Sequence, residues 1–145
     1  MQYELFTGDK MSNIWDNFTE YIIKNYGDAS LIIEVGVGSI LQPSRILNDK
    51  MENTIIRCVD INPANGDVIR DDITNPNYDI YEDADLIYSI RPPEELQKYI
   101  SDVARSVRCD CILKPFSSEE LSFKIKPRFK LVNYKREVFY LMSRF

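Results

Sequence analysis

Histidine is absent from this 145-residue chain, and its absence narrows the chemistry open to the protein. A Ser-His-Asp or Cys-His nucleophilic site, a histidine general base and most catalytic zinc sites all need imidazole. An active site here would have to use carboxylates, lysine, tyrosine, serine, cysteine or a cofactor. Cysteine is also scarce, at three residues, and the N-terminus has no signal-peptide pattern. We therefore expect free thiols in a reducing, cytoplasmic compartment.

Long apolar runs are missing as well. None approaches the ~18 residues of a membrane span, so no membrane association is expected. The chain is 44% hydrophobic and 28% charged, which is the composition of an ordinary folded domain rather than of a disordered segment. Its net charge of −5 argues against attraction of the whole surface to nucleic acid or anionic lipid. The length fits one domain over residues 1–145, as a monomer or a homodimer.

Apolar runs rich in β-branched residues alternate with helical periodicity along the chain. Buried strands are expected at residues 31–35, 54–61, 84–90 and 109–116, and an antiparallel pair at 129–134 and 138–142. Helices are expected at residues 11–27, after Pro43 and at 93–107, the first with Ser12 as N-cap and Ile14 on its inner face. This alternation predicts an α/β fold: a Rossmann-like, doubly wound, mostly parallel sheet in a three-layer sandwich, with the antiparallel pair at the C-terminus.

One connection is too short for this pattern. Only ten residues separate Asp60 from Asp71, whereas a crossover with its helix needs about 10–12 or more. One helix, or one helix and one edge strand, is therefore expected to be shortened or missing after the second strand.

Residues that could hold a ligand follow the predicted strands. Gly36 and Gly38 allow the backbone to approach a ligand closely, and Glu34 beside them can accept from a cationic amine. Asp60 ends the next strand, where a carboxylate can bind both hydroxyls of a ribose. Asp71 and Asp72 are close enough in the chain to meet an exocyclic amine. In a doubly wound sheet, ligands lie at this edge.

Two ligands compete for these residues. A dinucleotide fingerprint needs G-x-G-x-x-G with the pyrophosphate at a helix N-terminus, but Leu41 occupies the third glycine position and Glu34 would face phosphate. S-adenosylmethionine has no phosphate and carries a cationic amine and sulfonium, so an acid beside the glycines suits it better. The residues favour S-adenosylmethionine over a nicotinamide dinucleotide.

The strings LIIEVGVGSI and RCVDINP resemble the first two motifs of class I S-adenosylmethionine-dependent methyltransferases. VIRDDITNP, ADLIYSIRPPEEL and KLVNY further resemble a small uncharacterised archaeal-type family built on that fold. The resemblance implies that Glu34, Gly36 and Gly38 line the methionine end of the cofactor, that Asp60 meets the ribose and that Asp71 or Asp72 meets the adenine. Ser89, at the end of the third strand, is counted with these cofactor residues.

The segment Arg91-Pro92-Pro93 occupies the place of the superfamily's substrate-facing motif. Amino-methylating members have Asn or Asp before the two prolines and an aromatic residue after them, so this chain departs from their pattern. The prolines stiffen the exit from the strand, and Arg91 offers a forked donor for carboxylate or phosphate. A surface arginine with no ligand is the alternative reading, and Tyr88 is assigned to the core.

Six basic residues and no acid lie between residues 122 and 136. Lys124, Lys126, Arg128 and Lys130 alternate, which on a strand would give one positive face. This face is either a solvated edge or a docking surface for an acidic substrate such as RNA.

Cys109 and Cys111 are assigned to core packing rather than to a metal. The leading hypothesis is a methyltransferase of unknown substrate; a non-catalytic cofactor-binding or regulatory module and a nicotinamide-binding protein are the alternatives.

Overall fold

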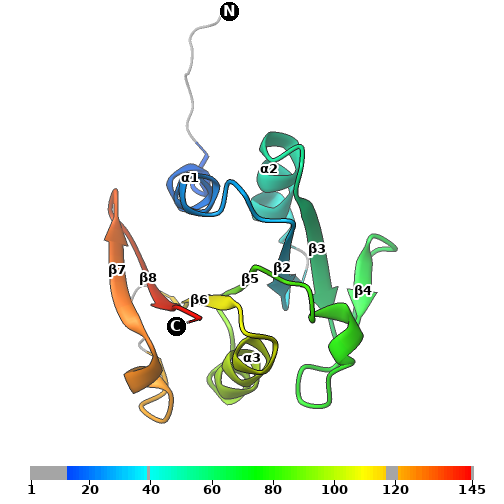
Figure 1. The fold of residues 1–145 in the computed structure, drawn as a ribbon, viewed down its shortest axis with the longest axis vertical. Coiled ribbons are helices and arrows are strands. Elements are labelled where there is room, and N and C mark those ends of the chain that lie inside the picture. The colour runs from blue at the N-terminus through cyan, green and yellow to red at the C-terminus, as the bar shows by residue number, and fades with distance from the viewer. Residues whose placement is uncertain (1–12, 39, 117–120, 145) are drawn as a thin grey trace, which may run out of the picture.

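Seven strands form one sheet in the order β4-β3-β2-β5-β6-β8-β7 (Figure 1). The computed structural model describes residues 13–38, 40–116 and 121–144. The strands are β2 (Leu31–Val35), β3 (Ile55–Asp60), β4 (Val68–Arg70), β5 (Leu86–Ile90), β6 (Asp110–Lys114), β7 (Lys130–Tyr134) and β8 (Glu137–Met142). The pairs β2–β3, β2–β5, β3–β4 and β5–β6 are parallel, and β6–β8 and β7–β8 are antiparallel. The carboxyl ends of the five parallel strands therefore meet at one edge of the sheet.

Helices cover both faces of the sheet and confirm the three-layer α/β fold. Figure 1 shows α1 (Asp16–Asn25) and α2 (Gln42–Lys50) on one face and α3 (Glu94–Val107) on the other. The α1/α2 face buries Phe18, Ile22 and Leu47 against Ile32 and Tyr88. The α3 face has its own core. It buries Ile100, Val103 and Ala104 of the helix against Ile33 and Ile87 of the sheet.

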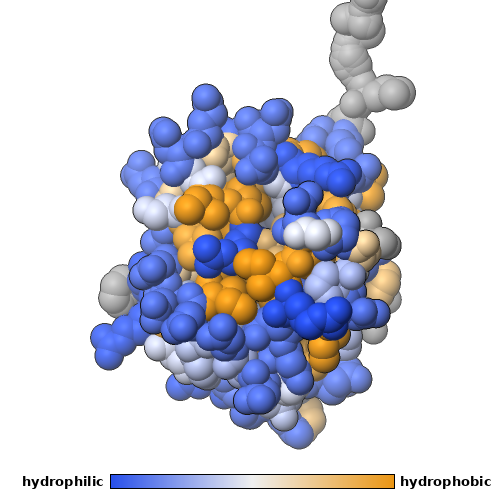
Figure 2. Space-filling view, turned by 90° about the vertical axis from the view of Figure 1, so that its right-hand side faces the viewer, coloured by the Kyte–Doolittle hydropathy of each residue, from blue (hydrophilic) through white to orange (hydrophobic). Residues whose placement is uncertain are grey.

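The shortened connection after β3 is confirmed. No helix lies in residues 61–67, all of which the structure describes, and the link from β4 to β5 contains only the 3-10 turn η1 (Tyr78–Ile80). The strand predicted at 54–61 is observed as β3, but the prediction that it is buried is wrong, because Ile55 is 61% exposed and Val59 is the only buried residue of the strand. Figure 2, which views the side of the molecule that carries β4, shows hydrophobic surface gathered there. Ile69 of β4 is 38% exposed.

The first helix begins later than predicted. Asn13 and Asp16 form the turn that precedes it: Asn13 Oδ1 accepts from the Trp15 amide and Asp16 Oδ2 accepts from the Asn13 amide, each at 2.8 Å. Ile14 lies in this turn and is 73% exposed, so its assignment to the inner face is wrong. The predicted N-cap, Ser12, lies outside the described residues.

The alternating basic run does not form a strand. Lys126–Arg128 is the 3-10 turn η2, and β7 begins only at Lys130. Pro127 explains the difference, because proline fixes φ near −65° and has no amide hydrogen for a strand ladder. The strand on which these residues would form a single positive face is therefore not present. Lys124 and Lys130 are exposed, while the half-buried Arg128 reaches α3.

Cys109 and Cys111 are buried in the core beside α3, which confirms their packing role. None of the helices within the described ranges is long and apolar enough to span a bilayer.

Candidate functional site

The turn after β2 is built on two glycines with left-handed backbone angles. Gly36 has a φ of 75° and Gly38 a φ of 55°, a region that other residues enter only with strain. The Gly36 amide donates to the Val59 carbonyl at 2.8 Å, and the Gly38 amide donates to Asp60 Oδ2 at 2.7 Å. The turn is therefore fastened to the end of the neighbouring strand β3.

Asp60 closes β3 and lies directly beside this turn. Its Oδ1 accepts a second hydrogen bond, from the Asn62 amide at 2.8 Å, so the two carboxylate oxygens are each oriented by a backbone amide. The side chain is half-buried. An ionised carboxylate has about four acceptor positions, so each oxygen can still accept from a ligand hydroxyl.

Glu34 lies within the sheet and is paired with Tyr88. The two residues are partners in the β2–β5 register, and the Tyr88 hydroxyl donates to Glu34 Oε1 at 2.7 Å. Glu34 is only 2% exposed. Burial raises the pKa of Glu34 to about 7, although the bond from Tyr88 acts in the opposite direction. In the part of the chain that the structure describes, Glu34 Oε2 has no hydrogen-bond donor, so this buried carboxyl can still take a cationic partner.

Ser89 joins Glu34 and the glycine turn. Its hydroxyl donates to the Val35 carbonyl at 2.7 Å, and the side chain is 2% exposed. A Cβ placed on Gly36 would lie 3.9 Å from Ser89 Oγ, so the two residues are in direct contact range. Ser89 therefore backs the turn rather than standing in open solvent.

Asp71 and Asp72 have different surroundings. The Asp71 amide donates to the Asp60 carbonyl at 3.1 Å, which places the two aspartates side by side at the sheet edge. Asp71 Oδ1 accepts from the Asn77 amide at 3.1 Å, and Oδ2 accepts from the buried Tyr81 hydroxyl at 2.7 Å. Both oxygens of Asp71 are thus engaged within the loop.

The side chain of Asp72 instead caps a surface turn. Its Oδ1 accepts from the amide and the hydroxyl of Thr74 at 3.0 and 2.7 Å. These bonds hold the pKa of Asp72 below its usual value. Since both bonds go to Oδ1, Asp72 Oδ2 is the one oxygen of this aspartate pair that accepts no hydrogen bond from the residues the structure describes.

Arg91 leaves the end of β5 with a left-handed φ of 54°, and its amide donates to the Lys114 carbonyl at 2.7 Å. Its guanidinium carbon lies 4.6 Å from the centre of the Phe116 ring and 6.0 Å from that of Trp15. These aromatic contacts hold the cation by cation–π attraction. The three side chains line a cavity of about 240 Å³ at the same sheet edge as Gly38 and Asp60.

The two prolines shape this exit. Pro92 is buried, and its carbonyl accepts a long hydrogen bond of 3.4 Å from Gln97 Nε2. Pro93 is the exposed N-cap of α3, with a φ of −55° and a ψ of 144°. Neither proline offers an amide hydrogen, so their contribution is to fix the direction in which Arg91 and α3 leave the sheet.

The structure thus brings together Glu34, Gly36, Ser89, Gly38, Asp60 and Asp71 at neighbouring strand ends, with Arg91 farther along the same edge. Sequence reasoning missed three contributors: the carboxyl-pairing role of Tyr88, and the aromatic partners Trp15 and Phe116. A register that pairs Glu34 with Tyr88 would have revealed the first. The two aromatic residues lie far apart in the chain, and no sequence pattern connects them.

Comparison with solved structures supports the fold. A "putative caffeoyl-CoA O-methyltransferase" from Staphylococcus aureus aligns with a TM-score of 0.60 over 93% of this chain and 85% of that protein, at 11% identity. An S-adenosyl-L-methionine methyl transferase from Silicibacter pomeroyi aligns with a TM-score of 0.53 over 92% of this chain and 100% of that protein, also at 11% identity. At such low identity the likeness shows a shared methyltransferase-like fold.

Comparison of sequences gives the family. A UPF0146 protein of Methanothermobacter thermautotrophicus is 39% identical over 127 residues, which cover 88% of this chain and 93% of that protein. A UPF0146 protein of Archaeoglobus fulgidus is 37% identical over 86% of this chain and 92% of its own length. The family model matches residues 15–144, which include every candidate residue described above. The chain therefore belongs to the uncharacterised protein family UPF0146.

Proposed function

We propose that this chain binds S-adenosylmethionine at the edge formed by the ends of β2, β3 and β5 and acts as a methyltransferase. The observation that carries the proposal is the hydrogen bond from the Gly38 amide to Asp60. It joins a left-handed glycine turn to a half-buried carboxylate on the adjacent parallel strand, in a fold that aligns with those of methyltransferase structures. When bound, the cofactor supplies an electrophilic methyl group.

The donor and acceptor groups on the chain fit this ligand. Asp60 keeps acceptor positions for the ribose hydroxyls, and Gly36 and Gly38 leave the backbone uncovered for close approach. Glu34 is a buried carboxyl whose Oε2 has no donor among the described residues, which suits the cationic amine of the methionine end. Asp72 Oδ2 is the better candidate for the adenine amine, because it accepts no hydrogen bond from the described residues, whereas each Asp71 oxygen already accepts one.

The cavity beside Arg91 is the proposed place of the methyl acceptor. Among the described residues Arg91 contacts Phe116 and Trp15 and pairs with no acid, since Glu137, which also lines the cavity, pairs with Lys114 at 2.9 Å. Its guanidinium nitrogens can therefore bind a carboxylate or phosphate on the acceptor. The chain would contribute chiefly by aligning donor and acceptor, since methyl transfer to a good nucleophile gains most from orientation.

One observation favours the non-catalytic alternative. Residues 61–67 contain no helix and the β4–β5 link only a 3-10 turn, so the wall over the adenine end is thin. A protein that binds the cofactor as a signal, without transferring its methyl group, would need no more than this. Incubation with S-adenosylmethionine labelled on its methyl group, in an extract of cells that lack the protein, separates the two: transfer of label supports the enzyme, and cofactor binding without transfer supports the module.

Calorimetry with S-adenosylhomocysteine tests the binding proposal. We expect one site, and we expect Asp60→Ala to weaken binding by about tenfold to a hundredfold, because a hydrogen bond to a charged group contributes ~1.5–3 kcal/mol. Asp60→Asn keeps one acceptor oxygen and should give an intermediate affinity. Asp49→Ala, on the exposed side of α2, is the matched control and should bind like the parent. Absence of binding by the parent protein would overturn the proposal.

A further inference from the structure

A second cavity, of about 740 Å³, lies at the opposite edge of the sheet from the candidate cofactor site. It is formed where α3 ends, β6 begins and β8 ends. Four of the chain's nine arginines line it: Arg105, Arg108, Arg128 and Arg144. No acid is among the lining residues in the described part of the chain, although the protein carries a net charge of −5.

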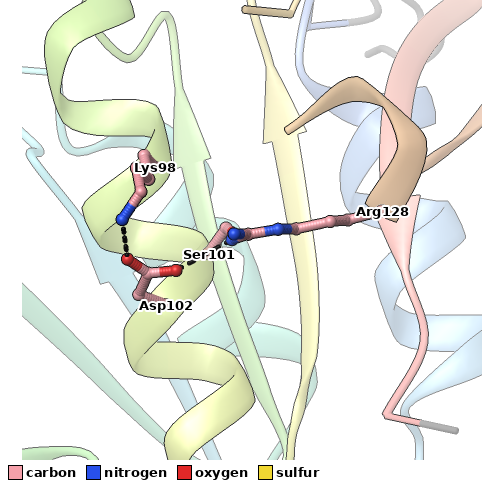
Figure 3. A network of polar contacts seen from close by, with 4 residues as sticks. All are labelled: Lys98, Ser101, Asp102 and Arg128. Atoms are coloured by element: carbon pink, nitrogen blue, oxygen red, sulfur yellow. Dashed lines mark hydrogen bonds and ion pairs between the residues drawn. The ribbon is translucent and has the colours of Figure 1, made fainter. Parts of the chain in front are cut away.

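Arg128 is fixed in the wall of this cavity. It crosses from η2 to α3, where one guanidinium nitrogen donates to Ser101 Oγ at 2.6 Å and to Asp102 Oδ1 at 2.8 Å (Figure 3). Lys98 binds the other oxygen of Asp102 at 2.7 Å, so this single carboxylate is shared by two cations. The Arg128 guanidinium is therefore held in position, but its charge is not fully neutralised, because Asp102 also pairs with Lys98.

Arg144 is fixed from the other side. Its amide donates to Asp110 Oδ1 at 2.9 Å, its Nε lies 3.4 Å from the same oxygen, and one terminal nitrogen donates to the Asp85 carbonyl at 3.1 Å. An arginine has five N–H donors, so both Arg128 and Arg144 retain donors for a ligand.

Arg105 and Arg108 have no acidic partner among the residues that the structure describes. Both are exposed, and Arg108 follows α3 with a left-handed φ of 62°, the position at which helices usually place glycine. A residue with a Cβ is strained in this conformation, so backbone geometry disfavours an arginine at this position. Interaction with the carboxyl end of α3 offsets only part of that cost at such an exposed place.

We propose that this cavity binds a small organic phosphate with at least two phosphate groups, such as a nucleoside diphosphate. Paired guanidinium groups match phosphate oxygens in a forked geometry, and four of them exceed what one carboxylate would need. The volume is that of a small-molecule site. Met142 and Cys109 also line the cavity and give it an apolar part for a base or other ring. Because the cavity lies at the far edge of the sheet, its ligand would regulate the protein rather than react in the cofactor site.

The same groups favour a small ligand over RNA. An RNA strand is bound along an extended positive surface, whereas the alternating run that predicted such a surface is broken at η2. The arginines instead converge on one cavity from α3, its C-terminal loop, η2 and the chain end.

Calorimetry with ADP, at low and at moderate salt, tests the proposal. We expect one site, weakened by salt and weakened about tenfold or more by Arg108→Gly, because a charge-assisted hydrogen bond is lost. Arg136→Gly is the matched control: Arg136 is an exposed arginine with a φ of 72° in the β7–β8 turn, outside the cavity. Both substitutions remove one positive charge and place glycine at a position with a left-handed φ. A difference in ADP affinity between the two variants therefore reports a contact of Arg108 with the ligand.

Four results would overturn the proposal. The first is no heat with millimolar ADP, and the second is equal weakening by the two glycine variants. The third is competition of ADP with S-adenosylhomocysteine or loss of ADP binding in Asp60→Ala, which would place ADP in the cofactor site. A short single-stranded RNA is titrated in parallel. If RNA binds more tightly than ADP and depends on Arg108, the ligand is RNA and the small-phosphate proposal fails.

Discussion

The Tyr88 hydroxyl donates a hydrogen bond of 2.7 Å to Glu34 Oε1 across two parallel strands, and both side chains are closed off from water. Burial raises the pKa of Glu34 to about 7 and raises that of Tyr88 well above its usual range. A carboxyl of this kind disfavours its own ionisation in the empty protein. Ionisation of Glu34 becomes more favourable when a cation binds beside it. The stability of the fold is therefore expected to depend on the proposed ligand.

Replacement of Glu34 by glutamine should change how stability depends on pH. In the parent the carboxyl holds its proton up to about pH 7 when folded but only to about pH 4.5 when unfolded, so the folded state binds more protons between these values. The free energy of unfolding should then fall as pH rises through this window, by at most roughly 3 kcal/mol. Glu34→Gln should lose this part of the slope and should be more stable than the parent above pH 7.

Urea unfolding at about pH 5 and about pH 8 measures this difference. When the dependence of the unfolding free energy on urea concentration is unchanged, the midpoint urea concentration is proportional to the free energy of unfolding. Glu52→Gln, at an exposed position after α2, is the control and should follow the parent at both values. Identical pH dependence in the parent and Glu34→Gln would contradict the buried, ionisation-resistant carboxyl.

Removal of the Tyr88 hydroxyl tests the other half of the pair. Tyr88→Phe keeps the ring, which packs edge-to-face on Phe18 with the ring centroids 5.9 Å apart. It removes the hydroxyl that donates the hydrogen bond to Glu34 Oε1. We expect a loss of about 1–3 kcal/mol at pH 8, because a buried acceptor is left unsatisfied, and a smaller loss at pH 5, where the carboxyl is protonated. Tyr140→Phe, a half-buried tyrosine of β8, should cost less at both values. If Tyr88→Phe lowers the free energy of unfolding equally at both pH values, the Tyr88 hydroxyl does not stabilise the ionised carboxylate of Glu34.

Substitutions of Asp71 and Asp72 should have different effects: that of Asp71 should lower mainly stability, and that of Asp72 should weaken mainly ligand binding. Asp71→Ala strands the buried Tyr81 hydroxyl and the Asn77 amide, and we expect it to cost about 1–3 kcal/mol in urea unfolding. Asp72→Ala removes a surface cap on Thr74 and should cost less stability than Asp71→Ala, while weakening S-adenosylhomocysteine binding. If Asp72→Ala binds like the parent, the adenine contact proposed for Asp72 is wrong.

Local patterns predicted those parts of the fold that local sequence determines. The strand at 31–35 is observed with the same bounds, since its apolar β-branched run is buried on both faces. The helix predicted at 93–107 begins one residue later, because Pro93 is its N-cap. The three-residue strand β4 was not foreseen as a separate element, since Val68–Arg70 is too short to show a period.

Features of the site that depend on tertiary contacts were beyond the sequence. The order of Glu34, Gly36, Gly38 and Asp60 along the chain predicted a shared sheet edge, and the bond between Gly38 and Asp60 fits that prediction. The pairing of Glu34 with Tyr88 depends on the register of two strands more than fifty residues apart, which hydrophobic periodicity does not encode. The alternation from Lys124 to Lys130 would give one positive face only on a strand, and the 3-10 turn that contains Pro127 lies there instead.

The contact between Arg91 and Trp15 gives the acceptor cavity an optical readout, because Trp15 is the chain's single tryptophan. Trp15 is 5% exposed, and with Arg91 it lines the cavity of about 240 Å³. Arg91→Ala should shift the Trp15 fluorescence to longer wavelength, because the loss of the guanidinium opens the ring to water. Arg91→Lys keeps the charge but not the planar stack, and should shift it less. Arg45→Ala, on the exposed side of α2, should leave the emission unchanged. A true methyl acceptor should alter the emission of the parent but not of Arg91→Ala, whereas an equal response in both would place the acceptor outside this cavity.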